Sequence, residues 1–119
     1  MEIRQLKEQL PFITADGSSI RSILDLSNAP VQRQSLAEAT LPAGAATERH
    51  YHRDSEEFYF VLDGVGVMEV DGEHQQVEPG DAVLIPAGAR HQVRAGDSGL
   101  LRFLCCCAPP YRHEDTFFD

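Results

Sequence analysis

Short apolar runs separated by tight-turn residues are the feature that most restricts the fold of this 119-residue chain. The runs have the length of strands, and glycine and proline interrupt them at strand-like intervals. Two of the turn signals are Asp16-Gly17 and Asp71-Gly72, and the second is typical of a type I′ hairpin turn. This pattern predicts an all-β domain in which about eight antiparallel strands close into a barrel or jelly roll.

One domain accounts for the whole length, because a chain of 119 residues is close to the usual domain size and buries about two thirds of its unfolded surface. We expect a barrel over residues 35–108, an N-terminal arm over residues 1–34 that packs on the barrel or on a partner subunit, and a C-terminal tail over residues 109–119. Residues 3–10 suit a short helix or turn that ends at Pro11. Strands are expected at residues 12–14, 19–26, 33–41, 58–62, 65–70, 74–77, 81–85, 91–94 and 100–107.

Three histidines and one glutamate lie at spacings that place them around a single metal ion. His50 and His52 are two residues apart, so in a strand both side chains leave the same face while Tyr51 points the other way. Glu57 follows a short polar interval and begins an apolar run, which places it at the mouth of a strand. His91 follows a turn at residues 86–88, and a second hairpin there returns the chain to the same mouth.

Three neutral imidazoles and one carboxylate form a borderline ligand set, which suits iron, manganese, nickel, cobalt or zinc better than calcium or magnesium. On an octahedral ion, four protein ligands leave two open positions for water, dioxygen or a chelating substrate. We therefore expect one divalent transition metal ion as the cofactor. The other nearby acidic and imidazole side chains, those of Glu56, His74 and His113, are expected at the surface.

The two stretches that contain these residues resemble the two signature motifs of the cupin superfamily, G(X)5HXH(X)3,4E(X)6G and G(X)5PXG(X)2H(X)3N. The fixed positions that match are Gly44, His50, His52, Glu57, Gly64, Gly80, Pro86, Gly88 and His91. One position departs, because Ala95 stands where the family has asparagine. The resemblance covers residues 35–108 and implies a small single-domain cupin with a jelly-roll barrel, also called a double-stranded β-helix, whose metal ligands are His50, His52, Glu57 and His91.

Known cupins that hold a metal include dioxygenases, isomerases and epimerases of sugars, decarboxylases and lyases, and other cupins only bind a ligand. The complete ligand set favours a metal-dependent enzyme on a small organic substrate that chelates the ion, an oxidoreductase of the quercetin-dioxygenase-like kind. Three alternatives stay open: a sugar- or carboxylate-binding or sensing protein without turnover, a sugar isomerase or epimerase, and a structural ion that only stabilises the barrel.

The strand that begins at Glu57 is apolar on both faces. If Glu57 faces inward, alternation places Tyr59 inward and Phe58 and Phe60 outward. Tyr59 is therefore a candidate catalytic residue whose hydroxyl acts as an acid or a donor to substrate near the ion, or else a core residue with its oxygen at the rim. An apolar outer face requires a cover. We expect a second subunit to supply it in a homodimer; the alternative is that residues 1–30 of the same chain cover it.

The chain has 10 Lys and Arg against 19 Asp and Glu, a net charge of −9. This balance repels nucleic-acid phosphates and anionic lipid surfaces, so we expect a small-molecule partner and neither nucleic acid nor a membrane. Residues 1–10 lack the apolar core of a secretory signal, and Cys105, Cys106 and Cys107 have no spacing suited to disulfides, which favours a cytoplasmic protein. We expect the three cysteines to be small apolar filler, the alternatives being redox activity or a place beside the metal ligands.

Overall fold

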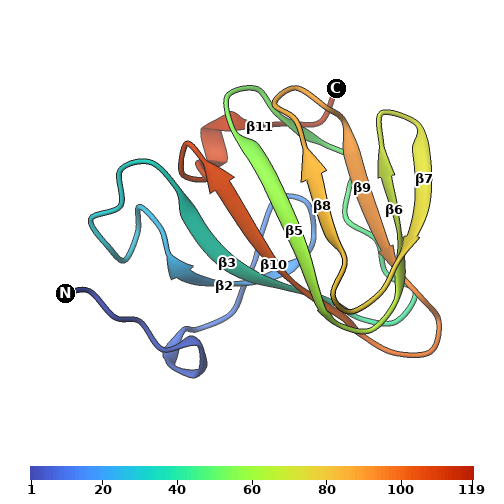
Figure 1. Ribbon diagram of the computed structural model, residues 1–119, viewed down its shortest axis with the longest axis horizontal. Helices are drawn as coiled ribbons and strands as arrows, with labels where there is room; N and C mark the ends of the chain where they lie inside the picture. Colours follow the sequence, from blue (N-terminus) through green and yellow to red (C-terminus); the bar gives the residue numbers. More distant parts are fainter.

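Antiparallel strands form two sheets and a short ribbon in a computed structural model that describes residues 1–119 (Figure 1). The strands are β1 (Phe12–Ile13), β2 (Ser19–Leu24), β3 (Ser35–Leu41), β4 (Tyr51–His52), β5 (Glu56–Asp63), β6 (Gly66–Val70), β7 (Glu73–Val77), β8 (Ala82–Ile85), β9 (His91–Ala95), β10 (Leu101–Ala108) and β11 (Thr116–Phe117). The larger sheet has the order β1-β2-β3-β10-β5-β8, and the smaller sheet has the order β7-β6-β9. β11 pairs with β4 in the separate ribbon.

Both sheets contribute to one hydrophobic core. The larger sheet supplies Leu41, Val61 and Phe103, and the smaller sheet supplies Met68 and Val93, all of them buried. Alternation along each strand turns these side chains inward, because successive residues of a strand point to opposite faces. The all-β jelly-roll fold expected from the sequence is confirmed.

Nine of the strands lie where the apolar runs predict them, with ends that differ by one or two residues, whereas β11 lies in the C-terminal tail, where no strand was expected. β2 ends at Leu24 rather than at residue 26, because a turn follows in which the side-chain oxygen of Asn28 accepts the backbone N–H of Asp25 at 2.9 Å. In the β6–β7 hairpin, Asp71 and Gly72 have φ values of 49° and 88°, as a type I′ turn requires. The short helix or turn expected at residues 3–10 is one 3-10 turn, η1 (Leu6–Glu8).

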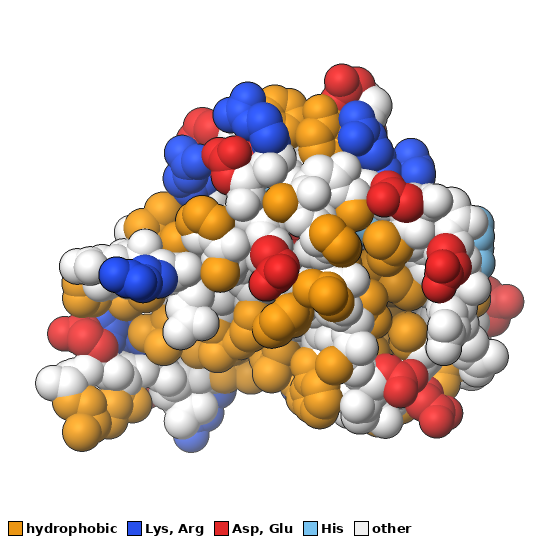
Figure 2. All heavy atoms as spheres, turned by 45° about the horizontal axis from the view of Figure 1, so that its top comes forward, with side chains coloured by type: hydrophobic (Ala, Val, Ile, Leu, Met, Phe, Trp, Pro, Cys, Tyr) orange, Lys and Arg blue, Asp and Glu red, His pale blue; other side chains and the backbone are white.

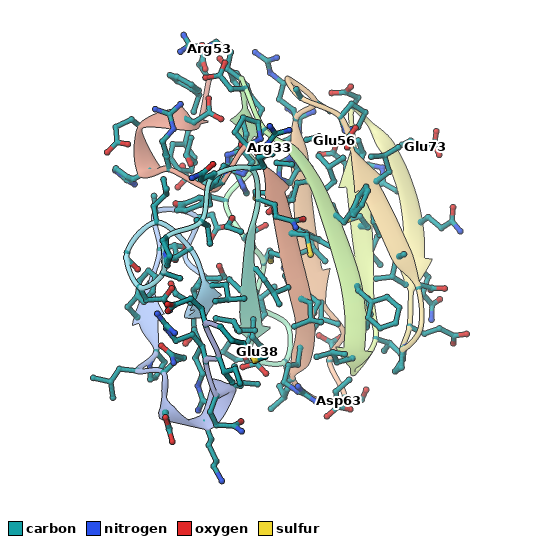
Figure 3. All side chains as sticks on the ribbon, turned by 60° about the vertical axis from the view of Figure 1, so that its left-hand side comes forward. Arg33, Glu38, Arg53, Glu56, Asp63 and Glu73 are labelled. Carbon is teal, nitrogen blue, oxygen red and sulfur yellow. The ribbon has the colours of Figure 1, made fainter.

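β5 has the inward and outward faces predicted for it. Glu57 and Tyr59 are 5% and 4% exposed, whereas Phe58 and Phe60 face outward. Glu56 is exposed, as expected, and lies at the upper end of the strand in Figure 3. The strand therefore presents Glu57 and Tyr59 to the interior of the barrel.

Both ends of the chain add walls to the barrel. β2 pairs with β3, so part of the N-terminal arm extends the larger sheet. In the C-terminal tail, β11 pairs with β4, with Thr116 opposite His52. The buried carboxylate of Asp115 accepts hydrogen bonds from the backbone N–H groups of Asp54 and Ser55, which hold the tail against the barrel. None of the helices has the length and apolar character that crossing a membrane requires.

The outer face of the larger sheet is apolar and exposed. The strand registers align Leu36, Cys106, Phe58 and Leu84 in one row across β3, β10, β5 and β8. Phe58 and Leu84 are 51% and 56% exposed, so the N-terminal arm does not cover them. Hydrophobic side chains also gather on the face of the molecule that Figure 2 shows. The homodimer expected to cover the outer face stays a prediction.

Substitution of Phe58 by glutamate tests that dimer. If two copies pack through the apolar row, an unpaired carboxylate in its centre destabilises their contact. We expect light scattering to give about twice the chain mass of 13.2 kDa for the native protein and the single-chain mass for Phe58→Glu. Val67→Glu, at a 44% exposed position on β6, is the control and should keep the native mass. A native mass of one chain contradicts the expected dimer.

Gly64 closes β5 with a φ of +82°, and a Cβ at this position would overlap the backbone carbonyl of Leu100. Gly80 has a φ of +95°, but a Cβ there would meet nothing. Gly80→Ala should therefore show only the left-handed backbone cost, roughly 1–2 kcal/mol of unfolding free energy. Gly64→Ala should lose about 1–3 kcal/mol more from the overlap, measured by urea denaturation. Equal losses in the two variants would show that the close approach at Gly64 does not matter.

Candidate metal centre

His50 and His91 are held opposite each other by the backbone. The N–H of His50 donates to the carbonyl of His91 at 3.0 Å, and the N–H of His91 donates to the carbonyl of His50 at 2.8 Å. Their rings lie 4.3 Å apart between centroids. His52 follows on the same face, while Tyr51 points away and stacks on Phe117 at 5.3 Å, as the alternation predicts. One nitrogen from each of the three imidazoles lies within 4.8 Å of the other two.

Glu57 reaches the same point from β5. Its Oε1 lies 3.3 Å from Nε2 of His52 and 3.4 Å from Nε2 of His91. Glu57 and the three histidines are between 0% and 5% exposed. The structure therefore brings together all four residues that the spacing singles out, inside the barrel.

Backbone carbonyls fix the tautomer of each imidazole. Nδ1 of His50 lies 2.8 Å from the carbonyl oxygen of Glu48, and Nδ1 of His91 lies 3.0 Å from that of Ala89. Nδ1 of His52 lies 3.3 Å from the carbonyl oxygen of a residue of the C-terminal tail, Asp115. A carbonyl only accepts, so each Nδ1 carries the proton and each Nε2 of a neutral ring keeps a lone pair. Such hydrogen bonds orient histidine ligands in metal sites.

Two buried atoms at the point of convergence have no hydrogen-bond partner, Oε1 of Glu57 and Nε2 of His91. Unpaired buried polar atoms are costly and rare in native proteins. Here both atoms are acceptors, and further acceptors surround them, so another protein lone pair cannot satisfy them. A cation satisfies all of them at once. As a set of ligands, the three imidazoles and the carboxylate thus fit a divalent transition metal ion.

The electrostatics of the site also fit a cation. Burial acts to raise the pKa of Glu57, but the neighbouring His52 and His91 outweigh it and lower this pKa to about 2, so the carboxylate is ionised at neutral pH. Burial, together with the nearby His91, lowers the pKa of His50 and keeps its ring neutral. Burial also acts against a charge on His52, but Glu57 outweighs burial and raises the pKa of His52. A proton and a metal ion therefore compete for the His52–Glu57 pair.

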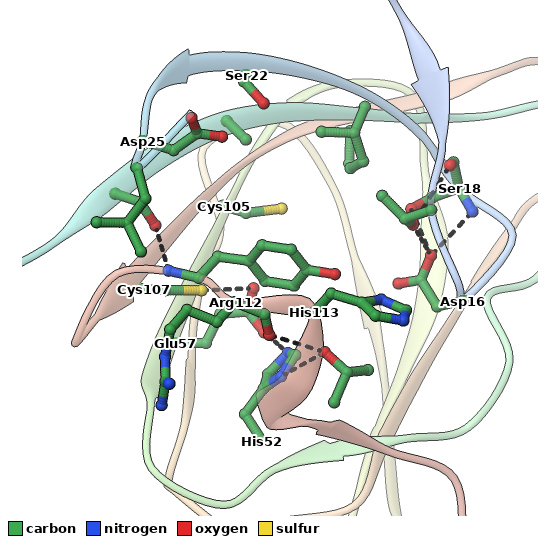
Figure 4. A pocket seen from close by; sticks show the side chains of 18 of the residues that line it. Asp16, Ser18, Ser22, Asp25, His52, Glu57, Cys105, Cys107, Arg112 and His113 are labelled. Carbon is green, nitrogen blue, oxygen red and sulfur yellow. Dashed lines mark hydrogen bonds and ion pairs between the residues drawn. The ribbon is translucent and has the colours of Figure 1, made fainter. Parts of the chain in front are cut away.

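A cavity of about 400 Å³ gives access to this point. His50, His52 and Glu57 line it, whereas His91 is fully buried. Many of the other lining side chains are apolar, and they come from β1, β2 and the turn after it, β3, β5 and β10. These apolar lining residues include Phe12, Ile20, Leu26, Ala37, Ala39, Tyr59 and Phe103. Residues 111–114 of the C-terminal tail, together with Thr116, complete the wall (Figure 4).

Tyr59 lines the cavity next to the ligands. Its ring lies 4.6 Å from the ring of Phe103 and meets the ring of His91 edge-on at 6.0 Å, between centroids. Burial, followed by the charge of Glu57, raises the pKa of Tyr59 well above its usual value, so the phenol stays neutral. The side chain is both a core residue and a neighbour of the site. Its role in catalysis stays a prediction.

Cys107 lies beside a metal-ligand candidate, and the interpretation as apolar filler is incomplete for it. Burial raises the pKa of this thiol, which stays protonated and donates to Oε2 of Glu57 at 3.3 Å. Burial also raises the pKa of Cys105, which lines the cavity. A reactive cysteine needs an accessible thiolate, so these pKa shifts disfavour the redox alternative.

Two groups at the site were not predicted from the sequence. Asp16 was interpreted only as part of a turn, yet its Oδ2 lies 3.7 Å from Nε2 of His50. The C-terminal tail was treated as a separate segment, yet the carbonyl of Asp115 contacts His52. Neither contact is marked by a local spacing. An acidic residue directly before a turn glycine was the only available signal for Asp16.

Comparisons with known proteins agree with this architecture. A family model described as the cupin domain matches residues 37–107. An uncharacterized protein of Methanocaldococcus jannaschii, MJ1618, is 44% identical over 106 residues, which cover 89% of this chain and 85% of that protein. Quercetin 2,3-dioxygenase of Bacillus subtilis is 32% identical over 74% of this chain, and acireductone dioxygenase of Sulfurihydrogenibium sp. is 33% identical over 76%. The chain spans only 28% and 45% of the length of those two enzymes.

Solved structures show the same fold. The polyketide cyclase RemF of Streptomyces resistomycificus superposes with a TM-score of 0.79 at 24% identity, covering 97% of this chain and 89% of that one. A predicted oxalate decarboxylase of Thermotoga maritima superposes with a TM-score of 0.76 at 22% identity, covering 90% and 98%. At these identities the likeness concerns the fold alone. The family match spans more than half of the chain and confirms the resemblance carried by the two motifs: this chain is a small domain of the cupin superfamily.

Proposed function

We propose that His50, His52, Glu57 and His91 hold one divalent transition metal ion, either iron, manganese, nickel, cobalt or zinc. Three imidazole nitrogens with fixed tautomers and one ionised carboxylate support this proposal, as do the two buried atoms that lack a partner. The set is typical of borderline metals rather than of calcium or magnesium.

We further propose that the protein is a metal-dependent enzyme, dioxygenase-like, that acts on a small organic substrate with adjacent chelating oxygens. One observation carries this proposal: the ligand cluster lies in the wall of a cavity of about 400 Å³ rather than in a closed core. A bound ion would supply a Lewis acid and an orienting template. The apolar lining residues, among them Ile20 and Phe103, bind the organic body of the substrate and exclude water. The neutral hydroxyl of Tyr59 donates a hydrogen bond to the substrate.

The relatives give limited support for the oxygenase class. Two of them are dioxygenases by name, and each is more than 30% identical over about three quarters of this chain. The chain covers less than half of each enzyme, so their substrates do not transfer. The support therefore concerns the class of chemistry and not the compound.

Two of the three alternatives fit the site less well. A purely structural ion does not need an organic-sized cavity beside it. Sugar isomerase or epimerase chemistry needs a group that accepts a proton near neutral pH, and the raised pKa of Tyr59 does not suit that task. A binding or sensing protein without turnover uses the same cavity and ligands, so only a measurement of turnover separates it from an enzyme.

His52→Ala tests the metal proposal. The variant removes one of the four proposed metal ligands, and three ligands hold an ion less tightly than four. We therefore expect elemental analysis to find most of the metal lost. The barrel should stay folded by circular dichroism, because His52 lies in the short ribbon and not in either sheet. His74→Ala, at an exposed position on β7, is the control and should keep the native metal content. Full metal in His52→Ala would exclude His52 as a ligand.

Turnover separates the enzyme from the binding protein. Native protein is loaded with iron, manganese or nickel and incubated with a panel of aromatic and aliphatic chelating compounds. We expect oxygen uptake and product formation with at least one compound, and neither with chelator-treated protein or with His52→Ala. Saturable binding of a compound with no change in it would support the sensing alternative instead.

A further inference from the structure

Asp16 is held rigidly by its own hairpin, in the turn between β1 and β2. Its Oδ1 accepts hydrogen bonds from the hydroxyl of Thr14 at 2.7 Å, from the backbone N–H of Ser18 at 2.9 Å and from the hydroxyl of Ser18 at 2.6 Å. Its side chain is 15% exposed and lines the cavity. Figure 4 shows Asp16 and Ser18 on one side of the cavity and Asp25 on the other. The three bonds fix the carboxylate and leave Oδ2 toward the ligands.

Oδ2 of Asp16 has no donor from the protein. The nearest ligand atom is Nε2 of His50, at 3.7 Å. Nδ1 of His50 carries the ring proton and donates a hydrogen bond to the carbonyl oxygen of Glu48. Nε2 therefore faces Asp16 with a lone pair. Two acceptors therefore face each other across this gap. Asp16 does not belong to either cupin motif, and the family match begins only at residue 37.

We propose that Asp16 is a specificity-determining residue: its Oδ2 accepts a hydrogen bond from a hydroxyl group of the ligand, so the cavity selects hydroxylated chelators over chelators that have only acceptor oxygens. This inference rests on the proposed metal site, because a chelating ligand would lie beside His50 and Asp16 only if the four proposed ligands hold an ion. The ligand class is that of α-hydroxy acids, diols and catechols. An α-keto acid of the same shape would place a keto oxygen against the carboxylate and leave Asp16 unpaired.

The charge of the cavity favours a hydroxyl group over a second carboxylate in the ligand. Four acidic side chains line it, Asp16, Asp25, Glu57 and Glu114. The only lysine or arginine that lines it is Arg112, which already pairs with Asp54 at 3.3 Å. A dianionic dicarboxylate would be repelled by this lining, whereas a hydroxyl group adds no charge and donates to it.

Mandelate and benzoylformate provide a matched pair of probes. They share a phenyl ring and a carboxylate and differ at the α-carbon, which carries a hydroxyl and a hydrogen in mandelate and a keto oxygen in benzoylformate. Calorimetry on zinc-loaded native protein should show tighter binding of mandelate, by at least about tenfold, since a hydrogen bond to a charged acceptor is lost with benzoylformate. This comparison needs no variant.

Asp16→Asn replaces Oδ2, the atom proposed to accept the hydrogen bond from the ligand. The amide oxygen still accepts from Thr14 and Ser18, and an NH2 group replaces Oδ2. This donor should suit the keto oxygen, so we expect the preference for mandelate to disappear or reverse while the zinc content stays native. Asp25→Asn is the control, because it removes one negative charge from the same cavity. Asp25 accepts a hydrogen bond from the backbone N–H of Ser27, and this variant should keep the native preference for mandelate.

The outcomes separate this inference from the metal proposal. Native protein that takes up none of iron, manganese, nickel, cobalt and zinc contradicts the metal site itself. Loaded native protein that fails to bind mandelate, or that binds both probes equally, overturns the role of Asp16 and leaves the metal site standing. The same holds if Asp16→Asn keeps the native preference, or if Asp25→Asn loses it as well.

Discussion

Everything at the site depends on one arrangement: nitrogen lone pairs of three imidazoles and the carboxylate of Glu57 meet inside the barrel. The backbone produces it. Two reciprocal backbone hydrogen bonds hold His50 opposite His91, and the Nδ1 atom of each of the three rings donates to a backbone carbonyl oxygen. Each Nε2 is therefore left as an acceptor that only a cation or a proton satisfies. The buried carboxylate of Glu57 supplies the negative charge that makes a cation the favourable occupant.

The surroundings of this cluster come from segments outside the two motifs. β2 and the turn before it supply one wall of the cavity, and residues 111–116 of the C-terminal tail supply another. Asp115 joins the C-terminal tail to the segment of the first motif, because its carboxylate accepts from the backbone of Asp54 while its carbonyl orients His52. The motifs therefore define the candidate metal ligands, and the chain ends add walls to the cavity beside them. In this chain, differences in specificity are expected to arise from the ends.

Most of the fold follows from local patterns. The alternation of residues in β5 predicted that Glu57 and Tyr59 face inward, and both are buried. The Asp71-Gly72 pair predicted a hairpin turn, and both residues have the positive φ that this turn requires. These predictions succeed because a strand repeats every two residues and a type I′ turn needs two positive φ values, both of which are properties of adjacent residues. The C-terminal end of β2 was misplaced by two residues, because the side chain of Asn28 closes a turn from outside the apolar run.

The sequence by itself determined the strand pattern, the barrel and the four residues that converge, because their spacings are tied to the strand period and to turn glycines. Only the tertiary structure decided which other groups meet them. Asp16 faces His50 across 34 positions of chain, and Cys107 donates to Glu57 across 50. Such contacts arise from the pairing of strands that are distant in sequence, and no local periodicity encodes which side chains that pairing brings together.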